Sequence, residues 1–114
     1  MSYAVEFTDV ADLEVQNILL WMMGRSPEQA ERWQDGLESA VTSLENFPGR
    51  CPLAPEQAAF DSEVRQLLYG KYRLLFITVD TDDDGERDTV RILHVRHGSQ
   101  RPIRRKEPDE DRPI

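Results

Sequence analysis

Arginine and histidine side chains recur in the second half of the chain, inside segments whose apolar and β-branched composition predicts strands. The residues concerned are Arg65, Arg73, Arg91, Arg96, His97 and Arg101. A guanidinium presents two parallel N–H donors to a phosphate or carboxylate, and an imidazole exchanges a proton near neutral pH. These groups suit either a contact with an anionic partner or the stabilisation of the phosphorane that forms when a 2′-hydroxyl attacks an RNA phosphate.

The charge of the chain is distributed unevenly. The net charge is −8, but residues 1–64 carry 12 acidic and 3 basic side chains, whereas residues 65–114 carry 10 acidic and 11 basic ones. Residues 89–106 contain six Lys or Arg and no Asp or Glu. One interpretation is a basic strip on an acidic body, which suits one oriented contact with an anionic protein or nucleic acid. The other is a solvated strand edge followed by a charged tail.

Length and composition predict a single domain, because 114 residues suffice for one hydrophobic core. Cys51 is the only cysteine, which excludes an intramolecular disulfide, and no apolar run approaches the roughly 20 residues that span a bilayer. The N-terminal residues lack the pattern of a signal peptide, so we expect a cytoplasmic protein without a membrane partner. Prolines and alternating charges predict a domain over residues 1–101 and a mobile tail over residues 102–114.

The first half of the chain predicts a short strand and a helical hairpin. Residues 4–7 form the strand, and apolar residues then recur at intervals of three and four up to Gly24, as in an amphipathic helix. Ser26-Pro27-Glu28-Gln29 offers a cap hydroxyl, a proline at the first helical position and a glutamine at the third, which marks a second helix. That helix is expected to reach Phe47 and to end at Pro48-Gly49.

Three further strands are predicted at residues 64–69, 72–79 and 89–97, after an irregular connector over residues 50–61. The middle strand is apolar on both faces, which indicates a central position in the sheet. The order strand, helix, helix, strand, strand, strand indicates an α+β fold. In this fold a helical hairpin packs on a sheet that contains a three-strand antiparallel meander.

Tyr72-Arg73-Leu74 in the predicted central strand and His97-Gly98 at the end of the last strand resemble motifs of the RelE/ParE family of type II toxin-antitoxin systems. The resemblance covers residues 3–101, and this family has the same order of elements. It implies a toxin that needs no cofactor and is neutralised by a cognate antitoxin. For ParE-like members the resemblance implies binding to DNA gyrase, and for RelE-like members it implies cleavage of mRNA on the ribosome.

The resemblance to RelE-type endonucleases assigns Arg73 to the scissile phosphate. If the chain is such an enzyme, we expect His97 or Arg101 to transfer the proton, because an imidazole titrates near neutral pH. The alternatives are an ion pair between Arg73 and an acidic helix residue, and a hydrogen bond from His97 at the sheet edge. RelE-type enzymes carry a lysine-rich cleft, whereas this acidic chain has only Lys71 and Lys106. We therefore favour the ParE-like interpretation. A non-toxic orphan binding module of the same fold is the third interpretation.

The antitoxin is expected to wrap the helical hairpin and to cover the basic strip on the sheet. The residues assigned to target or antitoxin binding are Arg65, Tyr72, Arg73, Arg96 and His97, which we expect to gather on one exposed cationic surface. Trp21 and Met23 lie slightly off the apolar stripe of the first helix. They either pack in the core or form a patch for pairing with another chain, as in a homodimer.

Residues 80–85 match the first half of a calcium-binding loop, with carboxylates at alternate positions followed by a glycine. The twelfth position is Arg91, where a bidentate Glu would be required, and the flanking segments predict strands where a calcium loop has helices. The sequence therefore predicts an acidic hairpin tip and no metal site.

Overall fold

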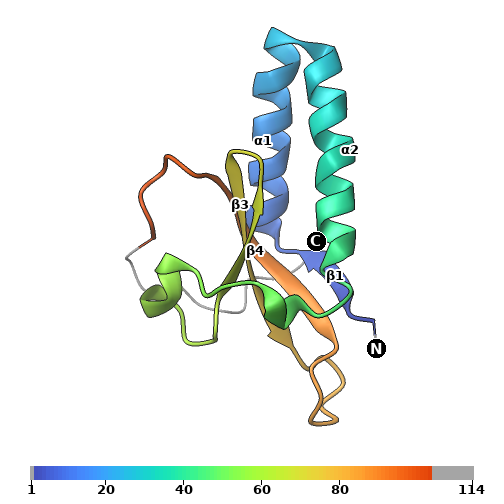
Figure 1. The fold of residues 1–114 in the computed structure, drawn as a ribbon, viewed down its shortest axis with the longest axis vertical. Helices are drawn as coiled ribbons and strands as arrows, with labels where there is room; N and C mark the ends of the chain where they lie inside the picture. The colour runs from blue at the N-terminus through green and yellow to red at the C-terminus, as the bar shows by residue number, and fades with distance from the viewer. Residues whose placement is uncertain (1, 104–114) are drawn as a thin grey trace.

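The computed structural model describes residues 2–103, which form a four-stranded sheet with two long helices on one face (Figure 1). The elements in chain order are β1 (Ala4–Phe7), α1 (Asp9–Arg25), α2 (Pro27–Ser43), the 3₁₀ helices η1 (Pro48–Arg50) and η2 (Pro55–Ala59), β2 (Arg65–Tyr69), β3 (Tyr72–Val79) and β4 (Thr89–His97). The predicted α+β order is confirmed. In the described part, none of the helices has the length and apolar character needed to cross a bilayer.

The strand order in the sheet is β1-β4-β3-β2. β2, β3 and β4 form the predicted antiparallel meander, with a register shift in the pairing of β3 with β4 next to Leu75. β1 was not assigned a partner from the sequence. It pairs in parallel with β4, from Ala4 opposite Thr89 to Phe7 opposite Ile92. The helical hairpin is part of the long connection, residues 8–88, that joins these two parallel strands.

Side-chain caps begin both helices. Thr8 Oγ1 accepts a hydrogen bond from the N–H of Ala11 at 3.1 Å, and Ser26 Oγ accepts one from the N–H of Gln29 at 3.3 Å. Ser26 is also the C-terminal cap of α1, so a single residue separates the two helices. This close connection fixes the helices side by side as a hairpin that extends beyond the end of the sheet (Figure 1).

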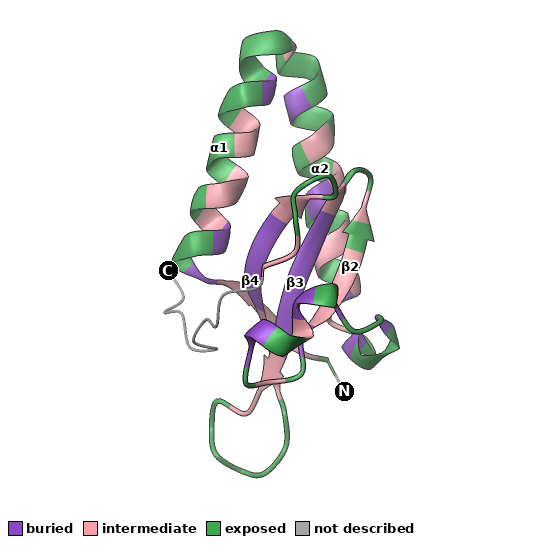
Figure 2. Cartoon of the chain, turned by 90° about the vertical axis from the view of Figure 1, so that its left-hand side faces the viewer, coloured by how far each residue is buried: buried purple, intermediate pink, exposed green. Residues whose placement is uncertain are grey.

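The core has two layers, one on each face of β3, and both central strands are buried along most of their length (Figure 2). On the helix side, the buried residues are Ala11, Leu37, Leu44, Cys51, Leu74, Phe76, Val90, Ile92 and Val95. On the other side, Leu75, Ile77 and Leu93 pack against Ala54, Ala59, Phe60 and Val64 from the connector. The predicted central position of β3 is confirmed, and the connector forms a second packed layer.

Three expectations about local structure need correction. α2 ends at Ser43, because the N–H of Leu44 bonds to the carbonyl of Val41 and tightens the last turn, so Phe47 lies outside the helix. Phe47 is 83% exposed and has a positive φ of 48°. The connector contains two 3₁₀ helices. Ile103, which was placed in the tail, packs against the layer formed by the connector, while residues 104–114 lie outside the described part.

Replacing Thr8 by Val is expected to lower the free energy of unfolding by about 1–2 kcal/mol. Thr8 is fully buried, caps α1 and donates its hydroxyl to the carbonyl of Ile92 at 3.0 Å. Valine keeps the shape and removes both interactions. Urea unfolding followed by circular dichroism measures the loss. Thr8→Ser keeps the hydroxyl and should retain most of the stability, so an equal loss in both variants would contradict the capping role.

Candidate functional site

Arg73 is buried and paired with Glu56. Its Nη1 and Nη2 atoms donate to Glu56 Oε1 and Oε2 at 2.9 and 2.6 Å, and Nη1 also donates to Gln66 Oε1 at 2.9 Å. Arg73 is 8% exposed. Arg73 therefore forms an ion pair with an acidic helix residue, as one of the two alternatives expected. The partner lies on the 3₁₀ helix η2 and not on α1 or α2.

Local sequence explains how Glu56 reaches this position. Pro55 occupies the first position of η2, where its fixed φ favours a helical turn, and Glu56 follows it directly. The turn packs on the face of β3 opposite to the helices, which is the connector side. There the N–H of Ile103 also donates to Glu56 Oε2 at 3.4 Å. Burial alone would raise the pKa of Glu56, but the hydrogen bonds and charge of Arg73 outweigh it and hold this pKa below its usual value.

The stability of the chain is expected to depend on the ionisation of Glu56. Because its pKa in the folded state is lowered, the pair contributes fully above the unfolded-state pKa of about 4.3 and is lost as the pH falls through the folded-state pKa. Urea unfolding of the parent and of Glu56→Gln at pH 7, 5 and 3 measures this contribution. The difference between the two proteins should shrink at pH 3. A constant difference would show that the ionised carboxylate contributes nothing.

The other arginines assigned from the sequence, all within the described residues, do not form a common cationic surface. Arg65 pairs with Glu63 at 2.5 Å, and Arg91 pairs with Glu6 at 2.8 Å. Arg96 Nη2 donates to the carbonyl of Arg101 at 2.9 Å. Arg73 and Arg96 are cross-strand partners on the connector side of the sheet. Arg65 is the partner of Phe76 and therefore faces the helix side. The prediction of one exposed cationic surface is wrong, because most of these guanidinium groups are engaged within the chain and lie on two faces.

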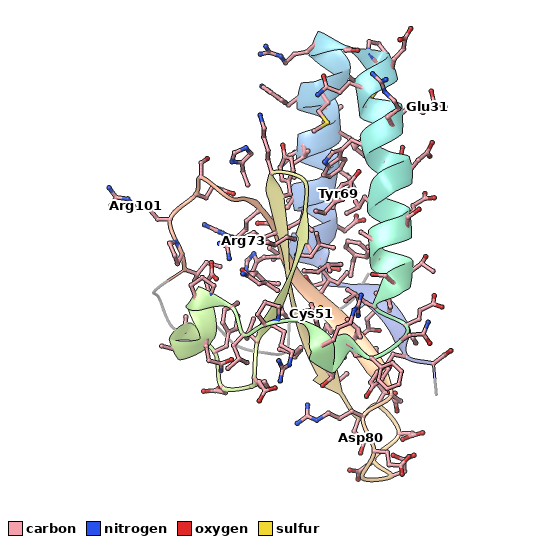
Figure 3. All side chains as sticks on the ribbon, viewed as in Figure 1. Glu31, Cys51, Tyr69, Arg73, Asp80 and Arg101 are labelled. Carbon is pink, nitrogen blue, oxygen red and sulfur yellow. The ribbon has the colours of Figure 1, made fainter. Side chains whose placement is uncertain are left out.

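Tyr72 and His97 are brought together at the end of the sheet. They are register partners on β3 and β4, and their rings lie edge to face with centroids 5.2 Å apart. His97 Nδ1 accepts from the backbone N–H of Ser99 at 3.0 Å, so the neutral imidazole carries its proton on Nε2. Arg101 is exposed and points outward from the C-terminal segment (Figure 3). His97 therefore holds the turn that follows β4, whereas the alternative considered for it was a hydrogen bond at the sheet edge.

Tyr72 and His97 line a groove between α1 and the end of β4. The groove has a volume of about 500 Å³. Its lining residues are Glu14, Asn17, Ile18, Trp21, Tyr72, Val95, His97, Ser99 and Gln100. A second hollow of about 380 Å³ shares Trp21, Tyr72 and His97 with it and continues under the tips of the helices to Trp33 and Tyr69. Aromatic walls with a few polar groups at the rim are typical of a ligand or partner site.

Within residues 2–103, no strand pairs with the edge of β4 beside this groove, because β1 ends at Phe7 opposite Ile92. Beyond Ile92, two backbone N–H groups of β4 that point to this edge bond to side chains of the same chain. The N–H of Val95 donates to Glu14 Oε1 at 2.9 Å, and the N–H of His97 donates to Gln100 Oε1 at 3.0 Å. An extended segment of a partner could replace these side chains and add to the sheet.

The sequence did not indicate Glu56, Glu14 or Gln100. Glu56 lies in an aperiodic connector, and Glu14 looks like one of several acidic residues on a solvated helix face. The Pro55-Glu56 step was the one local signal for a helical start in the connector. Trp21 and Met23 are exposed. Of the two alternatives given for them, core packing and a surface patch, their exposure fits the surface patch.

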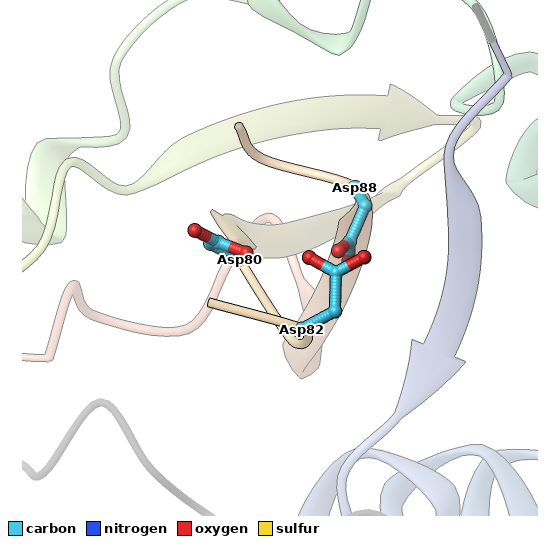
Figure 4. Close-up of side chains that lie close together, drawn as sticks. All are labelled: Asp80, Asp82 and Asp88. Carbon is cyan, nitrogen blue, oxygen red and sulfur yellow. The ribbon is translucent and has the colours of Figure 1, made fainter. Parts of the chain in front are cut away.

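Cys51 and the acidic hairpin tip offer little reactivity. Burial raises the pKa of the Cys51 thiol in spite of Arg50 and Arg65, so the thiolate nucleophile is disfavoured. Asp80, Asp82 and Asp88 each place a carboxylate oxygen within 4.8 Å of the others (Figure 4). The chain itself already uses these groups, since Asp80 accepts from the N–H of Gly85 at 2.7 Å.

We expect calcium to leave the melting temperature unchanged. The loop joins two strands and lacks the bidentate glutamate of a calcium-binding loop, so its carboxylates serve the hairpin turn. Thermal unfolding followed by circular dichroism, with and without millimolar calcium, measures the effect. An upward shift that disappears in Asp82→Asn would contradict this expectation.

Comparison with known proteins agrees with this architecture. A protein-family model described as "ParE toxin of type II toxin-antitoxin system, parDE" matches residues 5–102. The chain is similar to a chain of the toxin-antitoxin complex RelBE2 from Mycobacterium tuberculosis, with 28% identity, a TM-score of 0.55 and coverage of 85% of this chain and 99% of that chain. It shares its fold with a chain of the chromosomal ParDE system from P. aeruginosa, with 14% identity, a TM-score of 0.61 and coverage of 84% and 96%. No curated protein sequence gives a significant match. Since the family match spans most of its length, the chain belongs to the ParE toxin family of type II toxin-antitoxin systems.

Proposed function

We propose that this toxin-family member acts by binding a cellular target, DNA gyrase by resemblance, and that it does not cleave RNA. The observation that carries the proposal is the bidentate pairing of Arg73 with Glu56. Glu56 and Gln66 take three of the five N–H donors of Arg73, and the buried Glu56 carboxylate neutralises its charge, so this guanidinium is poorly placed to stabilise a phosphorane.

The remaining residues assigned to catalysis do not converge with Arg73. Arg73 faces the connector side of the sheet, whereas Tyr72 and His97 face the helix side, because successive residues of a strand point to opposite faces. His97 Nδ1 is occupied by Ser99, and Arg101 is exposed. A nuclease needs its acid, base and charge stabiliser around one phosphate.

A cognate antitoxin is the partner that we assign to the groove between α1 and β4. The groove presents Trp21 and Tyr72 as apolar contacts, and the free edge of β4 presents backbone groups to an extended segment. Both are features of peptide recognition by strand addition. Sequestering this end of the sheet would neutralise the toxin if the same end binds the target.

Controlled expression of the chain tests the proposal. We expect growth arrest with induction of a DNA-damage reporter, and recovery when the adjacent short reading frame is coexpressed. Primer extension on translated messages should show no cuts positioned by codons. Codon-positioned cuts would support the RelE-type alternative instead, and normal growth at full expression would support the non-toxic orphan module.

A matched pair of variants tests the groove. His97→Ala is expected to weaken antitoxin binding by about tenfold, the usual effect of truncating a residue at the centre of an interface. Ser39→Ala, at an exposed position of α2, serves as the control and should bind like the parent. Isothermal titration of the purified antitoxin gives both affinities. Equal affinities for the two variants would place the antitoxin elsewhere.

A further inference from the structure

Glu14 of α1 occupies the position that a neighbouring strand would take beside β4. Its Oε1 atom accepts the hydrogen bond of the Val95 N–H at 2.9 Å, whereas a strand would satisfy this N–H with a backbone carbonyl. The same carboxylate lies 3.2 Å from Nδ1 of His94, which is buried. The Glu14 side chain is 28% exposed and lines the groove between α1 and β4. A strand that adds to this edge must therefore displace Glu14 from Val95.

The displaced Glu14 carboxylate requires a new partner. A carbonyl of the added segment takes the Val95 N–H, and the segment itself excludes water from the rim of the groove. An ionised carboxylate that loses a donor and its solvent is destabilised unless a cation compensates it. His94 is charged only when it is protonated, and the described residues that line the groove include no lysine or arginine. The permanent cation that the displaced carboxylate requires must therefore come from the partner.

The charges around the groove differ between its two ends. Lys71 lines the second hollow under the tips of the helices, and Arg25 ends α1 at the same tips. Glu14 belongs to the other half of α1, whose first turn also carries Asp9 and Asp12. The groove is therefore acidic at the end that Glu14 occupies. Charge complementarity at this end favours a basic side chain on the segment that binds there.

We propose that the extended segment that adds to the free edge of β4 carries a lysine or arginine that pairs with Glu14. This inference rests on the proposed function, because it specifies the chemistry of the partner that the groove accepts. In the free chain Glu14 covers the edge, and in the complex it selects the partner by charge. An acidic segment of the same length would place a second carboxylate beside the displaced one, so Glu14 is a specificity-determining residue.

Two synthetic peptides test the charge preference without the natural partner. Each has the length of one strand, about seven residues, and alternates threonine and valine. One peptide carries a single central lysine, and the other carries a single central glutamate. Isothermal titration at low salt is expected to show that the lysine peptide binds the parent chain about tenfold more tightly. Equal affinities, tighter binding of the glutamate peptide, or no binding of either peptide would overturn the proposal.

Glu14→Gln tests whether this carboxylate causes the preference. Both peptides compete with the side chain at position 14 for the same Val95 N–H, so the ratio of their affinities reports the effect of charge alone. The ratio should fall from about tenfold to about twofold in this variant. Glu31→Gln is the matched control, because Glu31 is exposed on α2, does not line the groove and gives the same net charge (Figure 3). An equal ratio in the two variants would contradict the role of Glu14.

The purified product of the adjacent short reading frame separates this inference from the proposed function. Its affinity for the parent chain should fall by about tenfold between about 50 and about 500 mM salt, and less steeply for Glu14→Gln. Failure of this product to bind would contradict the proposed function, while the peptides would still measure the charge preference of the groove. Binding that His97→Ala weakens, but that is constant or rises with salt, would keep the groove as the partner site and overturn only the basic residue.

Discussion

Glu56→Ala is expected to lower the free energy of unfolding by about 3–5 kcal/mol, the usual cost of leaving a buried charge without its partner. The substitution strands the Arg73 guanidinium in a site that is 8% exposed, with Gln66 Oε1 as its remaining side-chain acceptor. It also removes the acceptor of the Ile103 N–H. Since domains of this size are stable by about 5–15 kcal/mol, urea denaturation should show a much lower midpoint.

Two controls separate the buried pair from charge effects in general. Glu63→Ala breaks the exposed pair with Arg65 and should cost less than about 1 kcal/mol. The double variant Glu56→Leu with Arg73→Met replaces the pair by apolar groups and should recover most of the loss. A loss from Glu56→Ala no larger than that from Glu63→Ala would mean that Arg73 reaches water when its partner is removed.

Gly36→Ala is expected to destabilise the chain by about 1–3 kcal/mol, although alanine is the better helix former. A Cβ at position 36 would lie 2.1 Å from the Tyr69 hydroxyl oxygen and 2.9 Å from its Cζ. Tyr69 cannot move aside freely, because its hydroxyl donates to the carbonyl of Trp33 at 2.8 Å and its ring packs on the Trp33 indole. Thermal unfolding measures the change.

Gly24→Ala provides the comparison within the same hairpin. A Cβ at position 24 meets nothing within 4 Å, so the substitution should gain about 0.5–1 kcal/mol from helix propensity alone. If both glycine variants are stabilised, Tyr69 adjusts easily and the contact between α2 and β2 is looser than its geometry indicates.

Local signals predicted the elements well. The step from Ser26 to Pro27 located the hairpin corner because a cap hydroxyl and a fixed φ act within a few residues. The strand bounds followed from β-branched and aromatic runs. The end of α2 was placed too late, because Phe47 continued the apolar period although its side chain is 83% exposed, whereas Leu44 is buried. Periodicity does not show where packing stops.

The site was harder to predict, because it depends on pairs that are distant in the sequence. Arg73 was singled out, but its partner Glu56 comes from a segment without periodicity, so no pattern joined them. Counting charges along the chain suggested a basic strip, yet alternation along β3 and β4 places Arg73 and Arg96 on the face opposite to the Tyr72–His97 pair. The groove also depends on the parallel pairing of β1 with β4, which ends at Ile92. Beyond Ile92, β4 pairs only with β3 in the described part of the chain, so its other edge is unpaired.

That parallel pairing has a consequence for how the protein is made. Val5 on β1 pairs with Val90 on β4. The first strand to be synthesised can therefore pair only after β4 has been synthesised. During translation the helical hairpin leaves the ribosome first, with the apolar faces of both helices still uncovered. A nascent chain stopped before residue 89 lacks β4 and with it one wall of the groove. Truncated products of interrupted synthesis would therefore lack the partner site proposed for the finished protein.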